Sequence, residues 1–158
     1  MEASQSIEPF AAAVLATTPL DVAGRSLRVW EEGGDAETVQ ARLERILAGH
    51  QQASARPLAA FGAAGDERPS PGDLLVVSDG RRRPRAVIEV IEARVLPFDR
   101  VDEHFAADYG EGDLSLRSWC EAHRAAFERE ARELGDVDPE LPLVAIRFRL
   151  VHPRLLGA

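Results

Sequence analysis

The chain has 158 residues, of which 45% are hydrophobic and 29% charged, and its formal net charge is −8. These values are typical of one globular domain and exclude a disordered or collagenous chain, while the single cysteine excludes an internal disulfide. All 19 basic residues are arginines, which near neutral pH can act neither as a general base nor as an amine nucleophile, so lysine-centred chemistry is excluded.

The sequence shows no sign of export or of a membrane span. The short apolar stretch from Phe10 to Leu15 follows acidic rather than basic residues, and no apolar run could cross a bilayer. We therefore expect a cytoplasmic protein with no membrane partner. The negative net charge argues against binding to duplex DNA, which needs a basic face. The few histidines and the cysteine are scattered, so neither a metal site nor a cofactor is expected.

The first half of the chain predicts two helices and an extended segment. The first helix is expected from Ile7 to Ala16. The second is better marked, because Asp35 is a good N-cap, Gly49 is a good stop, and the apolar residues between them recur at helical spacing. The segment from Gln52 to Phe61 reads as extended.

A β-hairpin is predicted next, with strands at Leu74 to Ser78 and Arg85 to Leu96. Its turn region carries a cluster of four arginines: Arg81, Arg82, Arg83 and Arg85. This cluster could bind phosphates or could be a solvated hairpin tip, and both interpretations stay open.

Glu89 is the best candidate for a buried carboxylate. On the second strand it shares a face with aliphatic residues, so its charge must find a partner or its pKa must rise. Arg147, on the last predicted strand, is the expected partner. Glu89 is thus either half of a structural ion pair or a functional carboxylate.

The second half of the chain predicts a short helix from Phe98 to Ala107, an acidic loop, a long helix and a final strand from Pro142 to His152. Asp113 is expected to cap the long helix, and Ser115 is the alternative cap. His123 lies on the apolar stripe of this helix and is expected to be a core histidine rather than a ligand.

Together these elements predict an α+β domain whose sheet curls around one core. We expect that residues 26–158 form this domain and that residues 1–25 form a helical extension packed on it.

The order of short motifs along the chain is similar to that of the ASCH domain, a family of the PUA-like superfamily. The similarity covers about residues 30–151 and is carried by these residues: Trp30, Gly34, Asp35, Gly49 to Ser54, Pro71 to Asp73, Val87 to Glu89, Pro97 to Asp99, Gly110 to Asp113, Ser115, Leu116, Trp119 and His123. The resemblance implies a small PUA-like β-barrel flanked by helices, with a cleft for RNA or nucleoside ligands. Members studied as enzymes include amidohydrolases of acylated cytidine, which use a lysine, a threonine and a glutamate, and reported ribonucleases.

One departure from the family pattern bears on chemistry. The family pattern after the second helix is Gly-Lys-Lys-Thr-Ala-Thr, and residues 49–54 of this chain are Gly-His-Gln-Gln-Ala-Ser. Ser54 therefore matches the last threonine, and Gln51 takes the place of the catalytic lysine. Glu111 falls at or next to the family's glutamate. A neutral amide can hydrogen-bond a substrate but cannot activate a hydroxyl.

The resemblance and the missing lysine together predict a binding protein. Its partner is expected to be a nucleotide, a modified nucleoside or a short single-stranded RNA. The expected cleft is lined by Gln51, Ser54, Glu89, Tyr109, Glu111 and Arg147. Trp30 and Tyr109 could offer stacking surfaces to a base, although Trp30 could equally pack against the barrel. The alternative is a hydrolase, amidohydrolase-like or a ribonuclease, in which Ser54 and Glu111 are catalytic and Gln51 assists.

Overall fold

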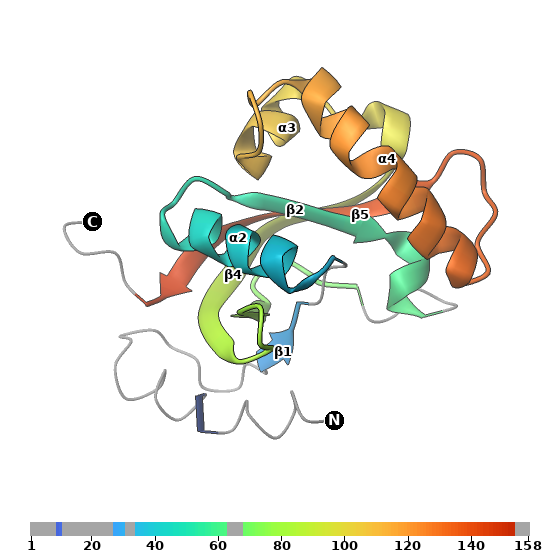
Figure 1. Ribbon diagram of the computed structural model, residues 1–158. Coiled ribbons are helices and arrows are strands. Elements are labelled where there is room, and N and C mark those ends of the chain that lie inside the picture. The colour runs from blue at the N-terminus through green and yellow to red at the C-terminus, as the bar shows by residue number, and fades with distance from the viewer. Residues whose placement is uncertain (1–8, 11–26, 31–33, 63–67, 154–158) are drawn as a thin grey trace.

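The computed structural model describes residues 9–10, 27–30, 34–62 and 68–153, and it shows an α+β fold (Figure 1). The strands are β1 (Leu27–Val29), β2 (Ala53–Pro57), β3 (Leu74–Ser78), β4 (Pro84–Pro97) and β5 (Pro142–His152). The α-helices are α2 (Ala36–Leu47), α3 (Glu103–Tyr109) and α4 (Leu116–Glu133), and two short 3₁₀ helices are η1 (Leu58–Phe61) and η2 (Phe98–Arg100). Of the helix predicted from Ile7 to Ala16 only Pro9 and Phe10 are described, so the extension predicted for residues 1–25 stays a prediction.

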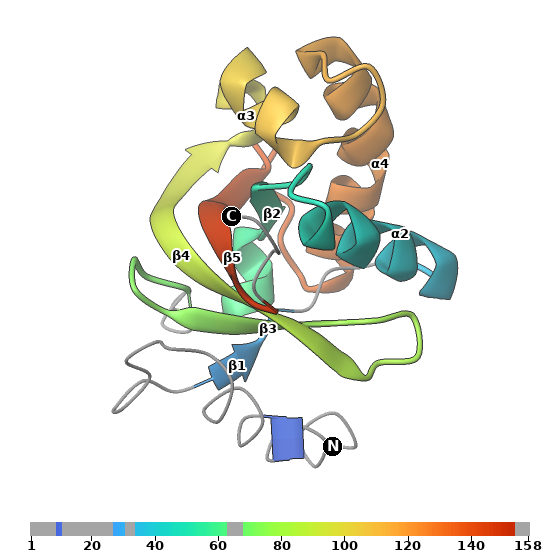
Figure 2. The same cartoon turned by 90° about the vertical axis from the view of Figure 1, so that its left-hand side faces the viewer.

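The five described strands form one mixed sheet in the order β1-β3-β4-β5-β2. Only the β1 and β3 pair is parallel, and the predicted hairpin is confirmed as the antiparallel pair of β3 and β4. The long strand β4 bends strongly, so that the sheet curls around the core without closing into a barrel (Figure 2). The α+β class is therefore confirmed, whereas the barrel implied by the family resemblance is present only as an open, curled sheet.

Local sequence signals explain where the helices begin and end. The Asp35 carboxylate caps α2 by accepting a hydrogen bond from the Thr38 backbone N–H at 2.8 Å, and Gly49 follows the helix with a φ of 79°. For α4 the expected cap was wrong. Ser115 is the N-cap, accepting from the Ser118 N–H at 3.1 Å, whereas the Asp113 carboxylate accepts from the Ser115 N–H just outside the helix.

Two hydrophobic clusters lie on either side of β2 and β5. One joins α3 and α4 to the sheet through an aromatic group of Phe98, Phe105, Tyr109, Trp119 and Phe127. The other joins α2 to the sheet through Trp30, Leu43, Ile46, Ile88 and Ile146. As Figure 1 shows, α3 and α4 pack above the sheet and α2 lies in front of β2. Helix α4 contacts β2 and helix α2 contacts β3, so a site can form in the space between these two helices.

Candidate functional site

A cavity of about 500 Å³ lies between α2, α4 and β2; we call it the α2–α4 cavity. Its wall includes Arg42 from α2, Ala55 and Arg56 from β2, Glu111 from the loop between α3 and α4, and His123 and Phe127 from α4. With Arg129, Glu130 and Glu133 also on the wall, the cavity brings three carboxylates, an imidazole and three guanidinium groups together beside two aromatic rings. Such a mixture of apolar surface and a few polar groups is typical of small-molecule sites.

Glu111 is the centre of a hydrogen-bond network at this cavity. One carboxylate oxygen, Oε1, is hydrogen-bonded to Nε2 of His123, and the other, Oε2, accepts from Nη2 of Arg45 at 3.1 Å. Burial raises the pKa of Glu111, but the hydrogen bond and charge of His123 and the charges of Arg45 and Arg42 lower it more, so the pKa is below its usual value. Glu111 is therefore ionised at neutral pH and held in place from two sides.

Glycines on both sides of Glu111 fix the path of its loop. Gly110 has a φ of 76°, and a Cβ atom there would lie 2.3 Å from the backbone oxygen of His50. Gly112 has a φ of 59°, and a Cβ there would lie 2.6 Å from Oγ of Ser118. Only glycine allows the loop to pack directly on the segment that begins at His50. This contact is what brings the Gly-Glu-Gly-Asp loop beside the Gly49 to Ser54 segment.

Gln51 is buried, with 1% of its surface exposed, and both ends of its amide are hydrogen-bonded. Its Oε1 accepts from Nε of Arg45 at 3.1 Å, and its Nε2 donates to the Ala53 carbonyl at 2.9 Å. The same guanidinium therefore binds Gln51 through one nitrogen and Glu111 through another. Arg45 supplies a positive charge beside the position where the resembled family has its lysine, but an arginine cannot accept a proton as a catalytic lysine does.

Ser54 is also buried, and its hydroxyl is used inside the core. Its Oγ accepts from the indole N–H of Trp30 at 3.1 Å, and only 1% of the residue is exposed. Trp30 stacks on Phe61, with ring centroids 5.8 Å apart. Ser54 is thus near Gln51 in the chain but does not line the α2–α4 cavity.

Glu89 lies away from this cluster. In the sheet, Glu89 lies opposite Leu74, which belongs to a third apolar cluster. Ser54 lies opposite Ile146, which belongs to the cluster around Trp30. Glu89 and Ser54 are therefore on opposite faces of the sheet. The expected partner was wrong, because Glu89 binds Arg149, with an Nη2 to Oε1 distance of 2.6 Å. Between Val90 and Glu92 the register of β4 and β5 shifts, which places Arg147 opposite Glu92 instead.

Tyr109 is the last residue of α3, and Arg147 of β5 contacts the same helix. Arg147 pairs with Asp108, and its guanidinium lies over the Phe105 ring at 5.8 Å, so it ties α3 to the sheet. Tyr109 is 1% exposed, and its ring centroid is 4.9 Å from that of His123. Tyr109 thus borders the α2–α4 cavity but offers no open ring face for stacking. Of the six predicted site residues, Glu111 and Tyr109 line this cavity, and Gln51 is joined to Glu111 through the Arg45 guanidinium.

Sequence reasoning missed the site roles of Arg42, Arg45 and His123. His123 does sit among core aromatic rings, as expected, but its Nε2 binds the site carboxylate. Arg42 is only 9% exposed, and arginine side chains are rarely so buried unless they are paired. The two arginines stand three residues apart between the apolar positions of α2, and that spacing is the only sequence signal that could have marked them.

Metal and membrane sites find no support in the described part of the chain. Within it, no three His, Cys, Asp or Glu side chains gather as metal ligands would. No helix among the described residues has the length and apolar content needed to cross a membrane.

Comparison with known proteins agrees with this architecture. The family model of the ASCH domain matches residues 28–152. The crystal structure of an ASCH domain from Lactobacillus crispatus JV V101 is similar over 96% of this chain and 95% of its own, with 31% identity and a TM-score of 0.80. Protein EF3133 from Enterococcus faecalis V583 is similar over 93% and 88% of the two chains, with a TM-score of 0.76, and at 23% identity it supports the fold alone. None of the curated proteins compared with the chain matches it.

The fold and the matched residues define an α+β domain of the ASCH type. The chain belongs to the ASCH domain family.

Proposed function

We propose that this protein binds a nucleotide, a modified nucleoside or a short single-stranded RNA in the α2–α4 cavity, and that it does so in the cytoplasm. The observation that carries the proposal is the network around Glu111, in which an ionised carboxylate is held by His123 and Arg45 at the wall of a cavity of about 500 Å³. A fixed carboxylate suits the amino and imino N–H donors on the edge of a nucleobase. Family membership supports the same class of ligand.

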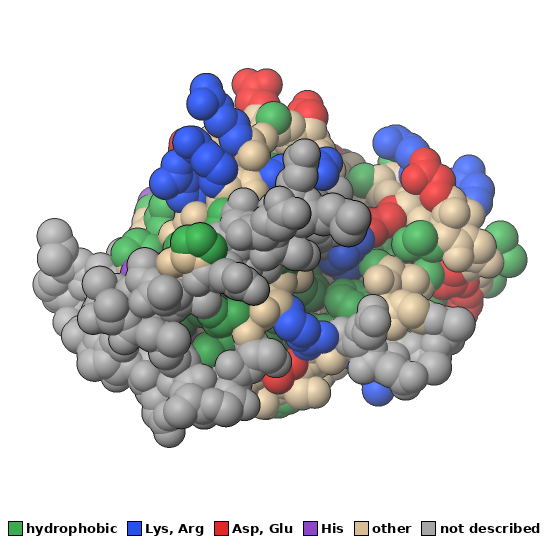
Figure 3. Space-filling model, turned by 90° about the horizontal axis from the view of Figure 1, so that it is seen from below, with side chains coloured by type: hydrophobic (Ala, Val, Ile, Leu, Met, Phe, Trp, Pro, Cys, Tyr) green, Lys and Arg blue, Asp and Glu red, His purple; other side chains and the backbone are tan. Residues whose placement is uncertain are grey.

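The charges around the cavity favour a ligand that is small or single-stranded. The charged residues that line the cavity are Arg42, Arg56, Arg129, Glu111, Glu130 and Glu133, and Arg56 is paired with Glu130 at 2.5 Å. On the face of the molecule shown in Figure 3, the described acidic and basic side chains are interspersed and form no continuous basic surface. Duplex binding depends on many phosphate contacts, whereas one base with one phosphate needs only a few well-placed groups.

The geometry favours binding over the hydrolase alternative. Lysine-type hydrolysis needs a group that can exchange a proton beside the nucleophile, and Gln51 and Arg45 cannot do so. The hydroxyl of Ser54 accepts from Trp30 and is buried away from the α2–α4 cavity. Turnover of acylated cytidine or labelled RNA that disappears in both Ser54→Ala and Glu111→Gln would favour the hydrolase instead.

Calorimetric titration tests the proposal. The purified protein would be titrated with the four ribonucleoside monophosphates, a panel of base-modified nucleosides and a short single-stranded RNA, with a duplex of the same sequence as the control. We expect saturable binding of at least one single-stranded or mononucleoside ligand and no comparable binding of the duplex. Absence of saturable binding across the whole panel would overturn the proposal.

A further inference from the structure

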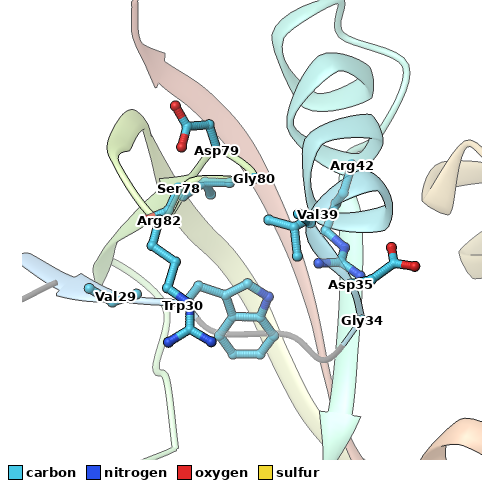
Figure 4. A pocket seen from close by; sticks show the side chains of 12 residues that line it. Val29, Trp30, Gly34, Asp35, Val39, Arg42, Ser78, Asp79, Gly80 and Arg82 are labelled. Carbon is cyan, nitrogen blue, oxygen red and sulfur yellow. The ribbon is translucent and has the colours of Figure 1, made fainter. Parts of the chain in front are cut away.

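A second cavity, of about 370 Å³, lies between the N-terminal half of α2 and the turn that joins β3 to β4 (Figure 4). We call it the hairpin cavity. Trp30, Val39 and Val77 give it apolar walls, and Arg42 and Arg82 are its basic residues. Gln51, Ser54 and Glu111 do not line it, so it is separate from the site proposed above, although Arg42 borders both cavities.

The turn beside this cavity is organised by Asp79, which is 4% exposed. The carboxylate accepts hydrogen bonds from the backbone N–H groups of Arg81 at 2.8 Å and Arg83 at 2.9 Å. It also accepts from Nε of Arg83 at 3.0 Å and Nε of Arg85 at 2.9 Å. Two of the four arginines in the cluster, Arg83 and Arg85, therefore share one carboxylate within the turn itself.

Arg82, like Arg81, differs from Arg83 and Arg85. It makes no ion pair with any residue that the structure describes. Its backbone φ of 64° is a conformation that residues other than glycine rarely adopt. In Figure 4 its side chain extends from the turn toward Trp30, whereas the carboxylate of Asp79 points away. Strained backbone of this kind concentrates at functional sites. The turn thus presents one guanidinium to the hairpin cavity.

The other charged groups of the hairpin cavity are the guanidinium of Arg42 and the carboxylates of Asp35 and Asp79. The second carboxylate at its wall, that of Asp35, already accepts from the Thr38 backbone N–H at the start of α2. On the apolar side, the Trp30 indole is held by its stack on Phe61 and its hydrogen bond to Ser54, so it forms a rigid wall. A rigid aromatic wall beside an unbalanced guanidinium suits a ligand with a planar ring and a phosphate.

We propose that the hairpin cavity binds a nucleoside 5′-phosphate, with the Arg82 guanidinium on the phosphate and the base against the apolar wall formed by Trp30 and Val39. The cavity volume of about 370 Å³ is within the range of small-molecule sites. The phosphate can belong to a free mononucleotide or to the 5′ end of an RNA. The proposal is independent of binding in the α2–α4 cavity, because it uses different residues for recognition.

The test follows the indole N–H signal of Trp30 by heteronuclear NMR during titration with uridine monophosphate. The indole signal of Trp119, whose ring lies against Tyr109 and His123, reports binding in the α2–α4 cavity and separates the two sites. We expect a saturable shift of the Trp30 signal, whatever the Trp119 signal does. In Arg82→Gly the dissociation constant should rise at least tenfold, while the turn keeps its fold because glycine adopts a positive φ freely. Arg81→Ala removes the same charge from the same turn and should change the affinity less than twofold.

Further arms identify the source of the phosphate. A 5′-phosphorylated RNA trinucleotide is compared with its 5′-hydroxyl form and with uridine monophosphate, and a preference for either phosphorylated ligand supports the proposal and names its source. No shift at Trp30, binding of inorganic phosphate as tight as that of uridine monophosphate, or equal losses in Arg81→Ala and Arg82→Gly would each overturn it. Glu111→Gln should leave this titration unchanged, which separates the result from that for the α2–α4 cavity.

Discussion

Asp79 and Glu111 both bind arginine side chains, but the separation in sequence between each carboxylate and its partners is very different. All the hydrogen bonds that Asp79 accepts come from residues two to six positions away. Glu111 binds Arg45, which is 66 positions away, and His123, which is 12 positions away. The Asp79 network shapes one turn. The Glu111 network fixes three separate elements around a cavity, which is the arrangement expected of a preorganised binding site.

The largest loss of stability should come from Gly110→Ala, which disrupts the close backbone contact that positions Glu111 at the site. The new Cβ would meet the His50 carbonyl oxygen at 2.3 Å at a φ of 76°, so relief requires the backbone to move. We expect a loss of stability of about 3 kcal/mol or more. Urea unfolding measures it. Gly62→Ala is the matched control, since its φ of 82° is similar but nothing lies within 4 Å; its cost should be about 1 kcal/mol, and equal losses would contradict the account.

Gln51→Lys tests whether the Arg45 guanidinium takes the place of the ammonium group that the family's lysine would supply. The lysine would be buried beside the Arg45 guanidinium, and we expect a loss of about 3 kcal/mol from placing two like charges together. In the double variant Gln51→Lys with Arg45→Gln, which exchanges the two groups, much of that loss should return. A double-mutant cycle from denaturant unfolding measures this coupling, and simple additivity of the two changes would contradict the role of Arg45.

Asp79→Asn weakens the local network and should cost about 2 kcal/mol, because hydrogen bonds to a buried carboxylate are among the stronger ones. Burial raises the pKa of Asp79, but the hydrogen bonds from the turn lower it more, to about 2 from the ordinary 3.8. The carboxylate's contribution is therefore present above pH 3.8 and is lost as the pH falls toward 2. Unfolding curves across this window should show the loss in the parent protein and not in Asp79→Asn.

Glu111→Gln should cost about 1.5 kcal/mol at neutral pH, since the amide keeps the shape of the carboxylate but loses the charge that faces His123 and Arg45. Because the pKa of Glu111 is lowered from 4.5, its contribution is complete above that value and disappears as the pH falls below it. The parent and variant stability curves should converge in acid. Curves that stay parallel down to low pH would contradict the ionised network.

The smallest effect compares two residues at the start of α4. Ser115→Ala removes the N-cap and should cost about 1 kcal/mol, whereas Asp113→Ala should cost a few tenths of a kcal/mol because its carboxylate lies outside the helix. Thermal unfolding of the two variants measures the difference. A larger loss in Asp113→Ala would restore the cap that the sequence first suggested.

Features set by neighbouring residues could be predicted from the sequence. Asp35 and Gly49 mark the ends of α2, and the alternation in the last strand predicts the burial of Val144, Ile146 and Phe148 in β5, although Leu143 and Ala145 are buried on its other face as well. Features that depend on tertiary structure could not. The bulge in β4 gives Arg149 rather than Arg147 to Glu89, and such a shift has no signal in a hydrophobic pattern.

The residues of the candidate site also fall into those that a sequence motif indicated and those that depend on tertiary packing. The family motifs pointed to Gln51 and Glu111, and the structure joins them through Arg45. No motif could show that an arginine of α2 reaches both, because that contact depends on how α2 packs on the sheet. Ser54 matched the family by position, yet its hydroxyl turns toward Trp30 inside the core.

The central claim is that Glu111 recognises a nucleobase in the α2–α4 cavity, and its most direct test is a comparison of two charge-neutralising variants. Glu111→Gln and Glu128→Gln each remove one negative charge, but Glu128 is exposed on α4 and does not line the cavity. Both would be titrated by calorimetry with the nucleoside or RNA that binds the parent protein best. The account predicts at least tenfold weaker binding by Glu111→Gln and unchanged binding by Glu128→Gln. Equal affinities of the two variants would contradict it.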